Sequence, residues 1–175
     1  MEFKYLSYGL LLLPAVAQAQ QIGVSVGPSS PSSYQLNITS NTTAPNSTSA
    51  YKMQGMAGSI TPQWTGTVLV TFSGTIYEPA GTAATIGINY QLSYGTGTAP
   101  TNNSTLTGTQ FGIIQSNENG ATVTAADMLQ PYSITAIITG LAIGTTYWLD
   151  LAAESIGTAS DQGFSTTSIT AAELP

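Results

Sequence analysis

The sequence contains no cysteine, no histidine and no arginine, and its only lysines are Lys4 and Lys52. The absence of cysteine excludes disulfides, thiolate metal ligands and thiol nucleophiles. The absence of histidine excludes a Ser-His-Asp triad and a histidine-bound zinc ion, and it removes the most common general base. Two lysines cannot neutralise a phosphate backbone or hold a chain on an anionic membrane. The sequence therefore predicts a protein that is not an enzyme, holds no metal or cofactor and binds no nucleic acid.

Charge is scarce as well. Charged residues make up 6% of the 175 residues, against about 25% in an average soluble domain. The net charge is −6, and 42% of the residues are hydrophobic, which is enough to fill a core. Solubility must then come from Ser, Thr, Asn, Gln and Gly, and a surface of this kind favours close protein–protein packing. The length accommodates one domain and a terminal extension.

The first 19 residues have the pattern of a secretory signal peptide. A short apolar run, which includes Leu10 to Leu13, precedes small residues at Ala17 and Ala19. Such a run is shorter than the roughly 20 residues of a transmembrane helix, and the small residues are those that a signal peptidase reads. We expect cleavage after Ala19, with no membrane contact afterwards and a secreted, extracellular or cell-envelope location. The alternative is that residues 1–19 are retained as an N-terminal anchor.

Residues 20–50 are of low complexity and rich in Ser, Thr, Asn and Pro. Such a composition buries little apolar surface and is typical of an extended linker or stalk. From Tyr51 onwards the pattern changes to alternating apolar and polar residues. We therefore expect a folded domain over residues 51–175, and we expect that this domain does not need residues 20–50.

Alternation with a period of two predicts the strands of this domain. The clearest run covers residues 86–94, and similar runs lie within residues 67–76, 134–138, 147–154 and 165–174. Turn residues separate these runs, and no window has a helical period of useful length. Seven or eight strands joined by turns predict an all-β antiparallel sandwich.

Several stretches of this domain resemble a known family. Residues 51–62 (YKMQGMAGSITP) and 66–70 (GTVLV) resemble the opening of C1q/TNF-like jelly-roll domains, as seen in phage tail-fibre and head-decoration proteins. Residues 94–100, 140–148 and 169–174 continue the similarity. The matching residues are turn glycines and apolar core positions, so the resemblance concerns the fold more than the function. It implies a jelly roll that assembles as a homotrimer and serves attachment or particle decoration.

A second resemblance is weaker and implies a different fold. Residues 140–147 (GLAIGTTY) are similar to a corner of fibronectin type III domains, where a tyrosine, here Tyr147, locks the turn between two strands. This similarity leaves an immunoglobulin-like or fibronectin-like sandwich as the alternative fold.

The candidate contact residues are Trp148, Asp150 and Trp64. Trp148 and Asp150 alternate with Tyr147 and Leu149, so we expect them on the outward face of their strand, while Trp64 follows Pro62 in a loop. An exposed tryptophan beside an acid fits a subunit interface or a stacked sugar ring. Asp150 and Glu154 share a face, but a separation of about 13 Å along a strand is too large for the carboxylate pair of a glycosidase. We expect both carboxylates to be solvated.

Two functions follow from these observations. The first is a non-enzymatic structural or attachment protein, of a virion or a cell surface, that forms homotrimers and contacts a viral particle or a cell-surface glycan. The second is a secreted carbohydrate-binding module that acts as a monomer. The oligomeric mass distinguishes them, because the first function requires a trimer.

Overall fold

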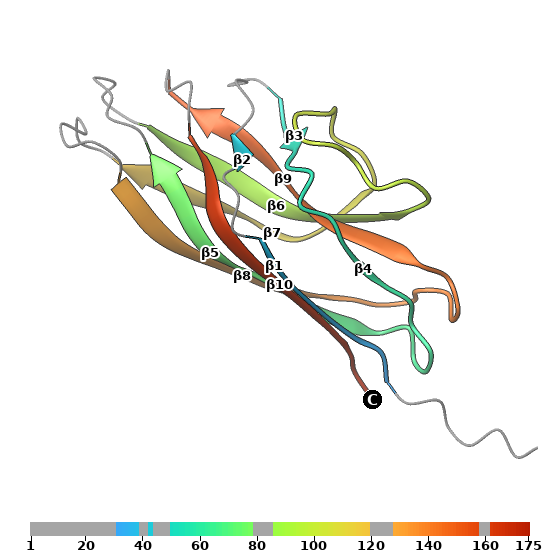
Figure 1. Ribbon diagram of the computed structural model, residues 1–175. Helices are drawn as coiled ribbons and strands as arrows, with labels where there is room; N and C mark the ends of the chain where they lie inside the picture. Colours follow the sequence, from blue (N-terminus) through green and yellow to red (C-terminus); the bar gives the residue numbers. More distant parts are fainter. Residues whose placement is uncertain (1–30, 39–41, 44–49, 79–85, 120–127, 158–161) are drawn as a thin grey trace, which may run out of the picture.

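The computed structural model describes residues 31–38, 42–43, 50–78, 86–119, 128–157 and 162–175, and the predicted signal peptide and its cleavage site lie outside them. The described residues form ten strand segments in two antiparallel sheets packed face to face (Figure 1). The segments are β1 (Ser33–Ile38), β2 (Thr42–Thr43), β3 (Lys52–Met53), β4 (Gly58–Ile60), β5 (Val68–Glu78), β6 (Ile86–Thr96), β7 (Thr109–Asn119), β8 (Met128–Ile138), β9 (Tyr147–Ile156) and β10 (Gly163–Glu173). The prediction of an all-β antiparallel sandwich is confirmed.

The strand order is that of a jelly roll. Sheet A has the order β1-β10-β5-β8, with β2 also on β10, and sheet B has the order β3-β9-β6-β7, with β4 also on β9. The antiparallel pairs are nested along the chain: β1 with β10, β3 and β4 with β9, β5 with β8, and β6 with β7. A long hairpin of nested pairs that rolls into two sheets is the double Greek key of a jelly roll.

The position of β10 excludes the fibronectin-like alternative. In immunoglobulin-like sandwiches the last strand pairs with the strand before it. Here β10 pairs with β1 and β5 in sheet A, whereas β9 lies in sheet B. The corner that suggested the alternative is nevertheless present, because the Tyr147 hydroxyl accepts the Ala142 N–H at 3.0 Å. The local motif was predicted correctly although the alternative fold was wrong.

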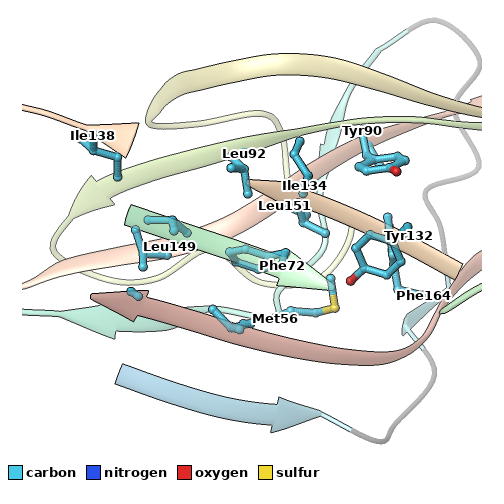
Figure 2. Close-up of a cluster of buried hydrophobic side chains, with 14 of the residues drawn as sticks. Met56, Phe72, Tyr90, Leu92, Tyr132, Ile134, Ile138, Leu149, Leu151 and Phe164 are labelled. Carbon is cyan, nitrogen blue, oxygen red and sulfur yellow. The ribbon is translucent and has the colours of Figure 1, made fainter. Parts of the chain in front are cut away.

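The core lies between the sheets and follows the predicted alternation. Val68, Val70 and Phe72 of β5 face Leu149 and Leu151 of β9 in one buried cluster. Figure 2 shows this cluster, in which Tyr90, Tyr132 and Phe164 meet edge to face at the other end. Edge-to-face rings contribute about 0.5–1.5 kcal/mol per pair beyond the burial of their area.

The domain begins before Tyr51, so the prediction that residues 20–50 are wholly a stalk is wrong. β1 pairs with β10 over six positions from Ser33 to Ile38, and β2 adds two more. Tyr34 and Leu36 pack against the core, where a Cβ on Gly58 would meet the Tyr34 ring at 2.5 Å. The short alternation Tyr34-Gln35-Leu36 is surrounded by Ser, Thr and Asn, and for this reason composition concealed the strand.

Among the described residues, no helix has the length and the apolar character that crossing a membrane requires.

Candidate functional site

Trp148 lies under a loop and does not reach the surface, so the prediction that it is exposed is wrong. Its side chain is 6% exposed and packs with Met53 and Ala152 in a second buried cluster on the outer face of sheet B. Half-buried residues complete this cluster, namely Tyr51, Ala57, Ala99 and Leu106. The alternation in β9 was predicted correctly, but the segment between β6 and β7 folds back over this face. The backbone of this segment bonds to Met53: the Met53 N–H donates to the Ser104 carbonyl, and the Met53 carbonyl accepts the Asn103 N–H.

Two glycines make space for the Trp148 ring. A Cβ on Gly95 would meet the ring at 2.5 Å, and a Cβ on Gly108 would also overlap it. The indole N–H donates to the Thr96 carbonyl at 3.2 Å. Trp148 is therefore a structural residue that fixes the covering loop, and it has no free face for a sugar or a second subunit.

Asp150 is fully buried, which contradicts the expectation of a solvated carboxylate. It accepts the N–H groups of Gly55 at 2.9 Å, Met56 at 3.0 Å and Leu151 at 2.8 Å. Desolvation raises the pKa of Asp150 to about 7, although these three hydrogen bonds favour the charged form. Its role is to hold the turn between β3 and β4 against β9. Glu154, on the same face, reaches solvent and accepts a hydrogen bond from Asn89 at 3.1 Å.

Trp64 is the one member of the predicted contact set that the structure exposes. Its side chain is 41% exposed and projects from the loop between β4 and β5. The backbone of this loop is bound to one carboxylate, that of Glu173 near the end of the chain. Oε1 accepts the N–H groups of Trp64, Thr65 and Gly66 at 2.7–2.9 Å, and Oε2 accepts that of Gln63 at 2.9 Å.

The same carboxylate reaches the N-terminal side of β1, where Oε2 accepts the Ser32 N–H at 3.1 Å. Burial alone would raise the pKa of Glu173, but the N–H donors of Gln63, Gly66, Ser32 and Trp64 together lower it to about 2. Five N–H donors on one buried carboxylate hold the loop in a single geometry. This function of Glu173 was not predicted, because no local motif relates it to a loop more than 100 residues earlier in the chain.

The loop between β8 and β9 supports the Trp64 loop from the side. Leu141 N–H donates to the Gly66 carbonyl at 3.0 Å, and Gly144 N–H donates to the Pro62 carbonyl at 2.8 Å. Gly66 has φ +69°, and a Cβ there would overlap the Leu141 carbonyl, so only glycine allows this approach. Ile143, on this second loop, is 51% exposed. We call residues 61–67 and 139–146 together the Trp64 tip, which lies at the end of the sandwich where the chain terminates (Figure 1).

A second exposed apolar surface lies on the side of the sandwich, where β7 and β8 meet. Opposite Gln91, the register of β7 contains a bulge formed by residues 112–114. The bulge directs Ile113 and Ile114 outwards, and they are 68% and 56% exposed. Ile137 of β8 is 53% exposed. Its neighbour Ala136 packs against Gly112, where an added Cβ would lie 2.8 Å from the Ala136 Cβ. We call Ile113, Ile114 and Ile137 the isoleucine patch.

The isoleucine patch is free of charge. Neither β8 nor residues 109–117 of β7 contain an Asp, Glu, Lys or Arg. Each of these strands pairs on one side only within the described part of the chain, β7 with β6 and β8 with β5. The patch was not predicted, because a bulge that turns two consecutive isoleucines outwards has no signal in an alternating pattern.

Neither a protein-family model nor a curated protein matches this sequence, so the Trp64 tip and the isoleucine patch are the observations from which a function can be argued.

Proposed function

We propose that this chain is a non-enzymatic structural and attachment protein that assembles into homotrimers on a virion or a cell surface. The isoleucine patch is the observation that carries the proposal. The centre of a subunit interface is apolar and depleted of charge. The isoleucine patch consists of three isoleucines that are each more than half exposed, in stretches of β7 and β8 without a charged residue.

The energetics support assembly through this patch. Burying one isoleucine side chain contributes about 1.5–3 kcal/mol. The three isoleucines are 53–68% exposed, so their burial contributes about 3–5 kcal/mol per copy. Several copies together reach the order of the roughly 4–15 kcal/mol that association costs. Assembly also covers the edges of β7 and β8 that pair with no other described strand, and exposed edges favour uncontrolled strand pairing. On a threefold axis, the patches of three copies meet at the centre, as the resemblance to trimeric jelly rolls implies.

Sedimentation of the 18.0-kDa chain tests this proposal. We expect a trimer for the wild type and a monomer for the Ile113→Asp/Ile114→Asp variant, because three copies would bring six carboxylates into one dry interface. Ile143→Asp is the matched control, since it charges a similarly exposed isoleucine in a loop and should leave the trimer intact. A wild-type protein that stays monomeric at tens of micromolar would overturn the proposal.

A monomeric carbohydrate-binding module is the second candidate function, and the exposed Trp64 favours it. A wild-type monomer that binds a sugar would select this function.

A further inference from the structure

We propose that the Trp64 tip is a binding site for a neutral saccharide, in which one face of the Trp64 indole stacks on a sugar ring. The inference rests on the attachment part of the proposed function, since it names the surface and the class of ligand. It does not depend on the number of subunits.

The backbone of the Trp64 tip is held rigidly. An exposed aromatic side chain on a mobile loop loses conformational freedom when it binds, and that loss weakens binding. In this loop the N–H groups from Gln63 to Gly66 all donate to the Glu173 carboxylate. The Thr65 hydroxyl also donates to the Leu174 carbonyl at 2.6 Å. The backbone that carries Trp64 is therefore ordered before any ligand arrives, as in a preorganised binding site.

The rigidity of the tip does not serve to bury Trp64. The five N–H bonds would equally stabilise a loop with a small polar residue at position 64, because they involve the backbone alone. A large apolar side chain that stays 41% exposed keeps a considerable part of its surface out of the core. Tryptophan is among the residues that are enriched in the side chains that dominate binding energy.

The chemistry around Trp64 identifies the ligand class. Residues 61–67 and 139–146 contain no charged side chain, and the charge of Glu173 is buried beneath five N–H donors. The hydroxyls of Thr61 and Thr146 lie 2.8 Å apart, so one O–H of this pair remains available to a ligand. A tip that carries an exposed indole ring and uncharged hydroxyls on the same two loops complements a sugar, which has an apolar ring face and hydroxyls at its edge.

Anionic ligands and membranes fit this tip less well. An anionic sugar or phosphate needs a cationic partner, and neither loop has a lysine or arginine. Membrane-surface segments combine aromatic residues with basic ones, and the basic component is missing here. The donors and acceptors beside Trp64 would also lose their hydration in a lipid interface without gaining partners.

Intrinsic fluorescence tests the inference, because the chain has two tryptophans. Trp148 is buried and Trp64 is exposed, so a ligand on the tip should change the emission of Trp64 alone. The probes are linear hexasaccharides of α-linked glucose, β-linked glucose, β-linked mannose and β-linked N-acetylglucosamine, together with phosphatidylcholine vesicles. Isothermal titration measures the affinity independently.

We expect at least one hexasaccharide to bind and to shift the emission. Trp64→Ala should weaken this affinity about 30-fold or more, as is typical of a dominant binding residue. Trp64→Phe should recover part of it, because it keeps an aromatic face. Leu129→Ala, which shortens an exposed side chain on β8, is the matched control and should leave the affinity unchanged.

Three results would overturn the inference: no hexasaccharide binds at millimolar concentration, a hexasaccharide binds equally well to Trp64→Ala, or Trp64 responds to vesicles and to no sugar. Sedimentation of the wild-type protein separates this test from that of the proposed function. A wild-type trimer that binds no sugar refutes only the site, and a wild-type monomer that binds a sugar refutes only the assembly.

Discussion

At the scale of single residues, glycine positions explain why Trp148 can be buried on the outside of a sheet. A tryptophan on an outer face needs neighbours that leave space for its ring. Gly95 of β6 and Gly108, in the loop between β6 and β7, provide this space. The three nearest atoms that a Cβ on Gly95 would meet all belong to the Trp148 side chain. The conflict between an alanine at position 95 and Trp148 is therefore confined to one pair of side chains.

This pair gives a double-mutant cycle with a definite sign. Gly95→Ala should lower the free energy of unfolding by about 1–3 kcal/mol through overpacking, and Trp148→Ala should lower it by about 3–5 kcal/mol through loss of packing. The double variant should be more stable than the sum of the two effects allows, because removing the ring removes the clash. Urea denaturation of the four proteins measures the coupling, and strict additivity would show that Gly95 does not make space for the ring.

At the scale of elements, alternation in the sequence was sufficient to predict the core-facing sides of β6, β8 and β9, but it did not reveal β1 or β7. Residues 88–94, 134–138 and 147–154 have the predicted inward faces, with Ile88, Ile134 and Leu149 buried. The outward-facing residues of β9 could not be assigned in the same way, because the loop between β6 and β7 covers them and buries them in a second cluster. Whether Trp148 or Trp64 reaches solvent depends on backbone pairing between segments far apart in the chain, which no local pattern encodes.

The edge strand β1 gives the second prediction. A chain that starts at Ala50 lacks the six pairings with β10, the apolar contacts of Tyr34 and Leu36, and the Ser32 N–H bond to Glu173. We expect its thermal midpoint to fall by roughly 10 °C or more, and the uncovered edge of β10 to promote aggregation. A chain that starts at residue 31 keeps these contacts and is the control. Equal midpoints for the two truncations would show that β1 adds nothing to stability.

At the scale of the whole molecule, the small number of charges makes the pH dependence of stability easy to attribute. The chain has eight acidic and two basic residues and no histidine, so few groups titrate between pH 2 and 8. Two acids in the described part of the chain, Asp150 and Glu173, are buried, and their pKa values are shifted in opposite directions. Asp150 has its pKa raised from 3.8 to about 7, and Glu173 has its pKa lowered from 4.5 to about 2.

These two shifts predict a stability maximum near pH 4. Glu173 binds fewer protons in the folded state than in the unfolded state, so its contribution is present above about pH 4.5 and is lost as the pH falls through 2. Asp150 binds more protons in the folded state, so its contribution is present below about pH 3.8 and is lost as the pH rises through 7. The free energy of unfolding should therefore rise from pH 2 to about 4, fall towards pH 7 and then level off.

Two variants separate the two slopes. Asp150→Asn should abolish the decline between pH 4 and 7, and Glu173→Gln should abolish the rise between pH 2 and 4.5, because each removes the titrating group. Glu173→Gln should also be less stable than the wild type at pH 7, since an amide N–H₂ would face N–H donors of the Trp64 loop. Glu118→Gln, which removes an exposed carboxylate, should keep both slopes. Urea denaturation from pH 2 to 8 measures the profiles, and a decline above pH 4 that persists in Asp150→Asn would show that another group causes it.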